Sequence, residues 1–590
     1  MTRLPPWRAI AALSALAVAV ATIPGVAVTN ASWVDVENDY ASVAALQCVG
    51  ATSLDSRATG RFLSGALLNS SINPVVGVTG VTVTNQGSGA TAVAGTPGAT
   101  YLLANNFDAP LSASAINSAI QLGTSVTLPI NWANTATGVY TQYGQALGSG
   151  RSTGASGVVT NMGAVDVTRI NGGTAPTVGR VSLSGLPYVG APLSGIADLN
   201  LEVGAVAASA TLDGCSYAWA GGTPTSSQLA RDYYVSQLRA NLTSDALRAL
   251  FGPSGVVPTA TQVVQTQVDT LLGTAATPTG TAESGIASSA LGGLTGALQT
   301  VVNSTVLLSL GTGNTSSTTI TLDLAPTVAL LTETKSTGGV SVNLGTGTVT
   351  IDAATLLGSL NGQPANTAVL TPTQLNAVLG RVDTIVGNQI ALVNTALTAA
   401  LNTATVNVQV HVNLSLAGAN VIGVDLGYTG TLAGMALGQA TTVGPTVSLL
   451  VLPTTVLNGL LSTVVSGLTP LLGGILSTVT GAVTAQANNP IGLNVNAFLA
   501  TAAAQRTASI NALGGALTAL GSILSVTLNA QPDQAPFPAS PYAPKAGASA
   551  LTDEFFVSAL RIGVLDRTGG GAASLVNLFL ASASVGPSVQ

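Results

Sequence analysis

The chain has 590 residues, of which 16 are Lys or Arg and 22 are Asp or Glu, so charged residues make up 6%. An ordinary soluble domain has about a quarter, which argues against a typical cytoplasmic enzyme surface. The composition of 47% apolar residues, 68 Gly and 4% aromatics requires a core of Ala, Val and Leu beneath a surface of Ser, Thr and Asn. The net charge is −6 and the basic residues are scattered, so nucleic acid is not expected as a partner.

The first 31 residues have the three parts of a secretory signal peptide. Arg3 and Arg8 precede an apolar run from Ala9 to Ile23, and small residues follow it. These fifteen apolar residues are fewer than the roughly 20 that span a bilayer. We therefore expect residues 1–31 to be removed on export, and the protein to work outside the cell or at its surface.

Residues 32–225 show short alternating runs separated by Gly, Asn and Pro. In the clearest run, apolar Leu199, Leu201 and Val203 alternate with polar residues. Short and regularly spaced strands are typical of a β-sandwich. This segment is predicted to be an N-terminal β domain.

Residues 226–530 are predicted to mix helices and strands. Charged residues are densest from Leu229 to Phe251, and their spacing predicts a helix that ends at Gly252 and Pro253. Further helices are predicted at about 259–273, 286–309, 372–403, 454–487 and 495–525. The clearest strand runs from Val406 to Leu416, with one face apolar and the other polar, so it should cover a core and meet water.

The last sixty residues begin with a connector and end with two strands. Five prolines between Pro532 and Pro544 indicate an extended connector over residues 531–550. Two strands, around Phe556–Leu565 and Leu575–Ser582, are not stable alone. We expect residues 551–590 to pair back onto the main β structure. The predicted fold is mainly β and sandwich-like, with long helices inserted in the C-terminal half, and α+β overall.

Cys48 and Cys215 are the only two cysteines. In an exported chain two cysteines most simply form one disulfide, and a pair of buried free thiols is the alternative. Closing a loop of this length would stabilise the fold by about 5 kcal/mol on the chain-entropy relation. We expect the bond to tie the start of the mature chain to the end of the N-terminal β domain.

Signals for catalysis and cofactors are few. The string from Gly150 to Gly154 matches a nucleophile elbow, with His411 as the one histidine able to act as its base. An elbow needs a buried strand before it and a helix after it, whereas this string has Gly and Ser on both sides. His411 is interpreted as a solvated surface histidine. The counts of Cys and His allow no Cys/His metal cluster, so no metal and no cofactor is expected.

Two groups of carboxylates keep other interpretations open. Asp35, Glu37 and Asp39 alternate along the chain and could offer oxygen ligands to calcium, although a solvated strand edge has the same pattern. Asp198 and Glu202 share one strand face. They are the first suspects if the protein is a secreted hydrolase that uses a carboxylate pair, which is the alternative to a non-enzymatic protein.

The 80 residues between Asp425 and Arg506 contain no charge. From Val456 to Val479, apolar residues recur at spacings of three and four with small polar residues opposite them. Such a one-sided stripe favours a helix packed on protein over a lipid-facing span. Integral membrane insertion is not expected, and a membrane-active protein that uses the helices at 454–487 and 496–525 is the third hypothesis.

Several stretches together resemble a known family. They are Trp33–Asp39, Ala58–Gly65, Tyr143–Ala146, Gly154–Val159, Ala197–Val206 and Ala559–Leu565. This set resembles the choice-of-anchor G proteins, which are exported surface proteins of actinobacteria. The resemblance implies a location at the cell surface and no catalytic motif. Family members carry alternative C-terminal sorting signals, but residues 585–590 show none, so covalent wall attachment is not expected.

The sequence therefore predicts an exported cell-surface or secreted protein with a structural or adhesive role and no catalytic activity. Its expected partners are components of the cell envelope or the extracellular surroundings. The basis is a large, low-charge surface of Thr, Ser and Asn without a catalytic constellation.

Overall fold

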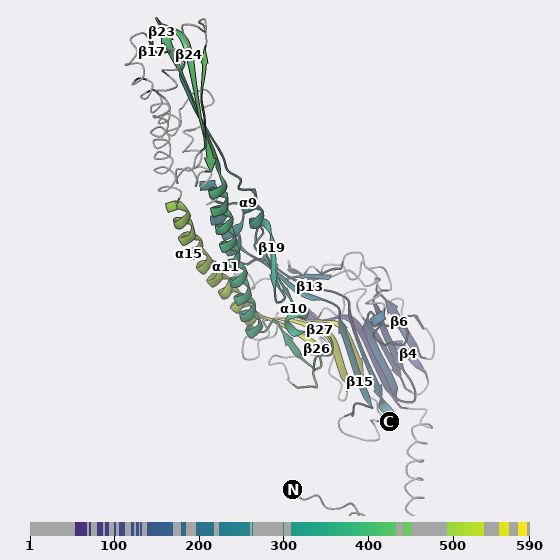
Figure 1. Cartoon of the computed structure of the whole chain (residues 1–590). Coiled ribbons are helices and arrows are strands. Elements are labelled where there is room, and N and C mark those ends of the chain that lie inside the picture. Colours follow the sequence, from purple (N-terminus) through teal and green to yellow (C-terminus); the bar gives the residue numbers. More distant parts are fainter. Residues whose placement is uncertain are drawn as a thin grey trace, which may run out of the picture.

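The computed structural model consists of a broad β base and a long arm that ends in a further sheet (Figure 1). The described residues are 54–67, 70–71, 80–86, 89–93, 100–101, 105–111, 120–122, 126–128, 130–132, 139–168, 179–183, 196–216, 224–259, 262–263, 295, 299, 308–431, 441–449, 492–535, 554–565 and 576–586.

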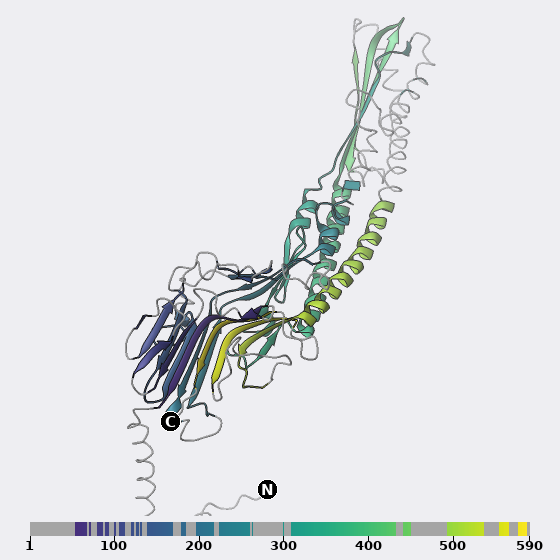
Figure 2. The same ribbon diagram turned by 180° about the vertical axis from the view of Figure 1, so that it is seen from behind.

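Two antiparallel sheets face each other in the base. The first has the order β22 (Thr367–Val369), β26 (Leu524–Ala530), β27 (Phe555–Val564), β28 (Val576–Val585), β1 (Ser56–Leu67), β3 (Val81–Asn85) and β4 (Ala90–Val93), with β2 (Ser70–Ser71) beside β1. The second has the order β15 (Leu229–Val235), β14 (Val206–Asp213), β11 (Arg151–Gly157), β10 (Thr141–Ala146), β6 (Asn106–Pro110) and β5 (Thr100–Tyr101). The first sheet thus combines strands from both ends of the chain, and Figure 2 shows them side by side.

Small residues let these two sheets approach unusually closely. A Cβ atom built on Gly60 would lie 2.0 Å from the Ala155 carbonyl oxygen of the opposite sheet. The Ser156 hydroxyl donates across the gap to the carbonyl oxygens of Arg61 at 3.0 Å and Ser582 at 2.8 Å. This part of the interface is therefore built on Gly, Ala and Ser rather than on large side chains.

A third sheet continues the base toward the arm. Its order is β19 (Thr334–Thr337), β20 (Val340–Asn343), β21 (Thr348–Asp352), β16 (Leu238–Ser244), β13 (Ile196–Val203), β12 (Gly179–Ser182) and β9 (Ile130–Trp132). Just before β9 in the sequence, β7 (Ile120–Leu122) and β8 (Val126–Leu128) pair with each other as a separate two-stranded sheet. The third sheet joins the second where β13 leads into β14 and β15 leads into β16. There Gly204 donates to the Gln237 carbonyl at 2.9 Å, and Ser236 donates to the Ala205 carbonyl at 2.9 Å.

An ion pair ties β15 to the segment after β26. Arg231 donates to both carboxylate oxygens of Asp533, at 2.5 and 2.7 Å, and to the Phe556 carbonyl at 3.1 Å. The Arg231 side chain is only 8% exposed. Burial raises the pKa of Asp533, but hydrogen bonds from Arg231 and Gln534 outweigh this and hold that pKa below its ordinary value. The pair therefore stabilises the base most when Asp533 is ionised.

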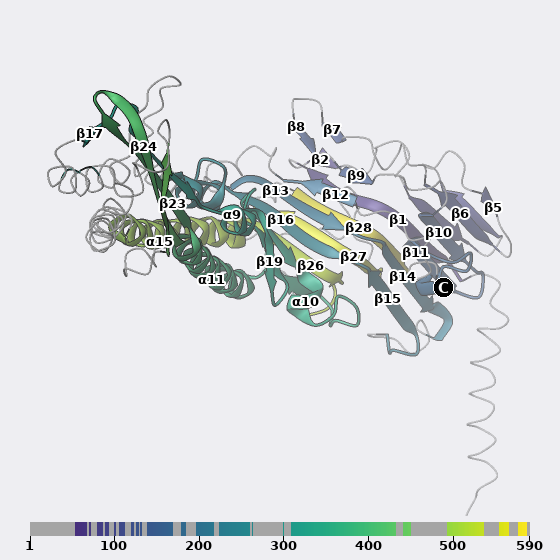
Figure 3. The same cartoon turned by 45° about the horizontal axis from the view of Figure 1, so that its top comes forward.

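The arm is built on two long helices that lie side by side, α11 (Pro372–Thr403) and α15 (Gly492–Ile523) (Figures 1 and 3). α11 begins in a capping box, since the Thr371 hydroxyl accepts from the Gln374 backbone N–H and the Gln374 side chain accepts from the Thr371 backbone N–H. Arg506 of α15 donates to the Asp383 carboxylate of α11 at 2.8 Å. Shorter helices α6 (Asp245–Phe251), α9 (Ala325–Thr332) and α10 (Ala353–Leu357) lie between the strands of this half of the chain.

A fourth sheet forms the far end of the arm and is called the distal sheet. Its order is β17 (Leu308–Leu310), β23 (Thr405–Leu416), β24 (Ala419–Thr431) and β25 (Thr441–Leu449), with β18 (Thr315–Thr321) also pairing with β23. β23 and β24 form a hairpin whose tip, Ala417 and Gly418, has positive φ angles of 51° and 86°. Two positive φ angles are what a type I′ hairpin turn needs.

The predicted fold class is confirmed, because the described part of the chain is mainly β with long helices in its C-terminal half. The helices predicted at 372–403 and 495–525 are α11 and α15. The strand predicted from Val406 to Leu416 is β23, and its apolar face is buried.

The helix predicted from Leu229 to Phe251 is wrong over most of its length. The structure has β15 and β16 there, and only α6 is helical. In β16 the side chains of Leu238, Ala240 and Leu242 are buried and alternate with partly exposed ones. This alternation of buried and partly exposed side chains is that of a strand with one face against the core. The burial of the apolar side chains outweighs the helical spacing of the charged residues.

Several predicted features lie outside the described residues. They are the signal peptide at 1–31, the acidic stretch at 35–39, Cys48, the helix at 454–487, nearly all of the helices at 259–273 and 286–309, and most of the connector at 531–550.

Candidate binding site on the distal sheet

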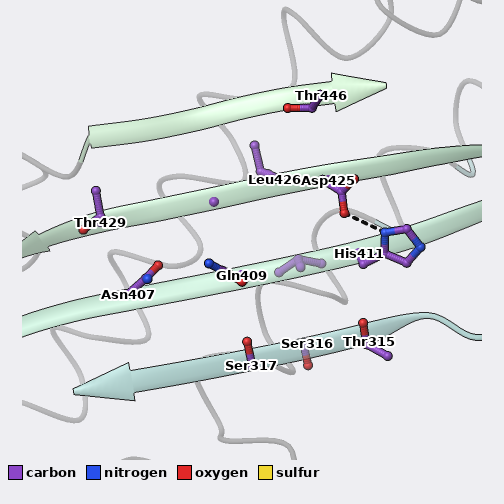
Figure 4. A pocket seen from close by; sticks show the side chains of 12 residues that line it. Thr315, Ser316, Ser317, Asn407, Gln409, His411, Asp425, Leu426, Thr429 and Thr446 are labelled. Atoms are coloured by element: carbon purple, nitrogen blue, oxygen red, sulfur yellow. Dashed lines mark hydrogen bonds and ion pairs between the residues drawn. The ribbon is translucent and has the colours of Figure 1, made fainter. Parts of the chain in front are cut away.

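A polar pocket of about 520 Å³ lies on the distal sheet (Figure 4). Its lining consists of Thr315, Ser316, Ser317, Asn407, Gln409, Val410, His411, Asp425, Leu426, Gly427, Thr429 and Thr446. β18, β23, β24 and β25 all contribute to this lining. The pocket therefore spans the sheet across its strands.

Strand alternation separates a polar from an apolar face. Along β23, Val408 and Val410 are buried, whereas Asn407 and Gln409 are exposed. Tyr428 of β24 is fully buried, and burial raises the pKa of its hydroxyl. Successive side chains of a strand point to opposite faces, so the polar side chains of β23 on the pocket side come from every second residue.

The strand register places the polar residues in rows across the sheet. His411 of β23 lies opposite Asp425 of β24 and Thr315 of β18. In the next rows, Gln409 lies opposite Gly427 and Ser317, and Asn407 lies opposite Thr429 and Thr319. Gly427 adds no side chain, so the middle row is open where its neighbours carry polar groups.

An irregularity in β25 brings Thr446 beside the first row. Asp425 pairs with Thr446, but two residues farther along β24, Gly427 pairs with Val443. One extra residue of β25 is therefore accommodated around Gly444 and Pro445, which is the behaviour of a β-bulge. Proline lacks a backbone N–H, so a bulge at this position loses little ladder pairing.

His411 is held at one end of the pocket by two side chains. Its Nδ1 lies 2.6 Å from the Asp425 Oδ1 atom, and its Nε2 lies 3.0 Å from the Asn413 Oδ1 atom. The Asn413 amide donates to the Thr312 carbonyl at 3.0 Å, which orients its oxygen toward His411. Both ring nitrogens thus face acceptors, so both contacts are hydrogen bonds when the ring is the doubly protonated imidazolium.

The other polar groups of the pocket have hydrogen-bonding capacity left. Within the described part of the chain, no side-chain hydrogen bond involves Asn407, Gln409, Thr315, Ser317, Thr429 or Thr446. An amide or hydroxyl side chain both donates and accepts hydrogen bonds. This part of the pocket can therefore bind a ligand that offers both donors and acceptors.

The sequence indicated the polar face but not the pocket. His411 was expected to be a solvated surface histidine, and the structure instead places it against Asp425 and Asn413, one third exposed. Asp425 is fourteen residues away in sequence. Its position opposite His411 depends on a register shift in the hairpin between Leu414 and Ser415, which no sequence pattern revealed.

The two carboxylates singled out in the sequence lie elsewhere, on β13 of the third sheet. Asp198 accepts a hydrogen bond from the Asn200 amide at 2.6 Å. Glu202 lies between Arg180 of β12 and Arg239 of β16 in the strand register. The row continues to Asp352, which pairs with Arg239 at 3.5 Å. Glu202 thus belongs to a row of alternating charge across four strands.

The elbow-like string has no elbow geometry. Residues 151–157 form strand β11, and Ser152 is fully buried in it. His411 is on β23 of the distal sheet, whereas β11 is in the base (Figure 3). The structure does not bring the two residues together.

Cys48 lies outside the described residues, so its pairing with Cys215 stays a prediction. The neighbourhood of Cys215 supports it. Leu54 forms a parallel bridge with Ser149, and a Cβ atom built on Gly150 would lie 3.1 Å from both the Leu54 side chain and the Cys215 backbone nitrogen. Cys48 precedes Leu54 by only six residues, which span at most about 20 Å.

In the part of the chain that the structure describes, no group of three His, Cys, Asp or Glu side chains could hold a metal ion. Asp35, Glu37 and Asp39, the candidate calcium ligands, lie outside these residues.

A family model described as a domain of unknown function (DUF8394) matches residues 58–586. The match extends from β1 in the base, through the arm, to the residue after β28. No curated protein and no solved structure matches the chain.

Proposed function

The chain belongs to the DUF8394 family, whose function is unknown, and we propose that it is an exported, non-enzymatic surface protein that uses its arm for attachment. In this role the base is the structural part and the polar pocket of the distal sheet is the adhesive part. The expected partners are components of the cell envelope or the extracellular surroundings. The resemblance to choice-of-anchor G proteins and the signal-like N-terminus support the location.

The observation that carries this proposal is the separation of the pocket from the base. α11 has 32 residues and is therefore about 48 Å long. The first long strand, β1, and the last strand, β28, are neighbours in the base, while the distal sheet lies at the other end of the helices (Figure 1). A protein retained by either end of its chain would present the pocket outward.

The hydrolase alternative has little support from the carboxylates suspected for it. Asp198 and Glu202 are four residues apart on one strand, and their Cα atoms are about 13 Å apart at about 3.3 Å per residue. Paired carboxyl groups of glycosidases are about 5 to 10 Å apart. The neighbouring Arg180 and Arg239 further favour a structural role for Glu202.

The membrane-active alternative rests on the helices at 454–487, which lie outside the described residues, and at 496–525, which is α15. Among the described residues the single helix that could span a membrane by length and composition is a different one, α11. Yet α11 carries Arg381 and Asp383, and Asp383 pairs with Arg506 of α15. Its buried side chains form one stripe, from Leu375 to Leu397, which is typical of a helix packed on protein.

Fractionation of the producing cell into cytoplasm, membrane, wall and medium tests the proposed location. We expect the protein in the medium or as loosely held wall material. The matched control is the same chain without residues 1–31, which should stay in the cytoplasm. Full-length protein in the cytoplasm, or a strict requirement for detergent during purification, would overturn the proposal.

A substrate screen tests the absence of catalysis. The wild type and an Asp198→Ala variant would be assayed on polysaccharides and esters, with Asp232→Ala as a control because Asp232 is an exposed carboxylate on β15. We expect no turnover by any of the three. Turnover by the wild type that Asp198→Ala abolishes and Asp232→Ala retains would establish a hydrolase instead.

A further inference from the structure

We propose that the pocket on the distal sheet binds a neutral, hydroxyl-rich polysaccharide that lies along β23. This inference rests on the proposed surface function and names the class of ligand for it. It is carried by the charge balance of the pocket, by its unused hydrogen-bonding groups and by its rigidity.

The charge balance favours an uncharged ligand. His411 and Asp425 are the two ionisable residues of the described lining, and they pair with each other at 2.6 Å. All the other polar side chains there are amides or hydroxyls. An anionic polymer would find no Lys or Arg among them, and a cationic polymer would find one carboxylate, Asp425, which already contacts His411 at 2.6 Å. Either polymer would lose hydration with little compensation.

The unused groups fit a ligand made of hydroxyls. Sugar hydroxyls both donate and accept hydrogen bonds. So do the hydroxyls of Thr315, Ser317 and Thr429, and so do the amides of Asn407 and Gln409, which accept at oxygen and donate at nitrogen. These groups lie in adjacent rows about 6.7 Å apart along each strand and about 4.8 Å apart between strands. An extended chain can therefore contact several rows at once, whereas a small molecule reaches only one or two.

Rigidity lowers the entropic cost of binding. His411 is fixed by Asp425 and Asn413, and Asn413 is fixed in turn by the Thr312 carbonyl and by Asn314, whose side chain accepts from the Asn413 backbone N–H at 2.8 Å. These bonds join the segment between β17 and β18 to β23 and β24 at one end of the pocket. This end of the pocket is already held in place, so it loses little freedom when a ligand arrives.

The lining differs from a protein-binding surface. The centres of protein interfaces are enriched in Tyr, Trp, Phe, Met and Arg. The described lining of this pocket contains none of these residue types. Without aromatic stacking each pocket should bind weakly, so firm attachment requires many copies acting on one polymer.

Depletion assays with the full mature chain test the proposal. The probes are amorphous cellulose, immobilised dextran and immobilised galactomannan as neutral polymers, with polygalacturonate and chitosan as charged comparators. The test variant is Asn407→Ala with Gln409→Ala. The matched control is Asn402→Ala with Gln505→Ala, which removes the same two amide types from exposed positions on α11 and α15.

We expect the wild type and the control to bind at least one neutral polymer, and the test variant to bind it about tenfold more weakly, as the loss of two hydrogen bonds predicts. A second variant, Gly427→Gln, fills the open middle row and should weaken binding without removing a polar group. Circular dichroism shows whether each variant is folded.

Three results would overturn the proposal. They are failure of the wild type to bind any neutral polymer, binding confined to the charged polymers, and equal binding by the wild type and both pocket variants. Each of them leaves the proposed surface location intact, because cell fractionation measures that location independently.

Discussion

Replacing Gly154 with Ala should destabilise the base strongly, because the two facing sheets have no space for even one methyl group. Gly154 is on β11, and a Cβ atom there would lie 2.5 Å from the Thr59 carbonyl oxygen and 2.6 Å from that of Ser584. Both oxygens belong to backbone of the opposite sheet, on β1 and β28, so neither can move as a side chain can. Ordinary contact requires about 3.4 Å. Overpacking of this kind costs typically 1–3 kcal/mol, and we expect about 3 kcal/mol because two strands must shift together.

Gly380→Ala is the matched control, because it makes the same chemical change at a site with no atom within 4 Å. Gly380 lies inside α11, where Ala is favoured over Gly by roughly 0.5–1 kcal/mol, so this variant should be slightly stabilised. Urea unfolding followed by circular dichroism measures both midpoints. An unchanged midpoint for Gly154→Ala would refute the reasoning, since it would show that the sheets separate at little cost.

Three further changes test the base, the arm and the cysteines. Asp533→Asn should lower the free energy of unfolding by about 2 kcal/mol, because the largely buried Arg231 loses its charged, partly exposed partner. Folding depresses the pKa of Asp533, so the ionised carboxylate stabilises the fold above the ordinary carboxyl pKa near 4. This stabilisation disappears as the pH falls through the depressed pKa. Urea midpoints measured from pH 7 to pH 2 should therefore depend less on pH in the variant than in the wild type. Thr371→Ala removes one half of a capping box and should cost about 1 kcal/mol, measurable as a lower urea midpoint, whereas Thr371→Ser should retain the cap; equal loss in both variants would contradict the capping role. Oxidised protein should titrate with no free thiol, and Cys48→Ser with Cys215→Ser should fold with up to about 5 kcal/mol less stability; two free thiols in the exported protein would disprove the disulfide.

Elements with one strong periodic signal could be predicted from the sequence. β23 alternates strictly in sequence, and its burial follows that alternation from Thr405 to Val412, beyond which Asn413 and Ser415 are buried as well. The helix predicted at about 372–403 is α11, whose start is stabilised by the Thr371–Gln374 capping box and by Pro372 in its first turn, and whose buried stripe is continuous. In both elements, the residues of the segment itself determine whether it forms a strand or a helix.

Features that depend on how strands meet could not be predicted. The charged residues from Leu229 to Phe251 recur at helical spacing, but β15 and β16 enter two different sheets that are built largely by other segments of the chain. The pocket depends on two irregularities, near Leu414 in the hairpin and near Pro445 in β25, which shift the strand register. A shift of one residue would have turned every polar side chain to the other face.

The central position of β28 in the first sheet has a consequence for how the molecule is made. β28 pairs with β1 on one side and with β27 on the other, and the contact between Ser64 and Ser582 joins residues 518 positions apart. Contacts of such long range carry a large loop-closure entropy and form slowly. Until residues 576–585 have been synthesised, β1 has an open edge and the base lacks a strand that covers β11 and β14. The base can therefore complete its fold only after that segment has emerged, and a chain that stops before it exposes strand edges that another copy can pair with.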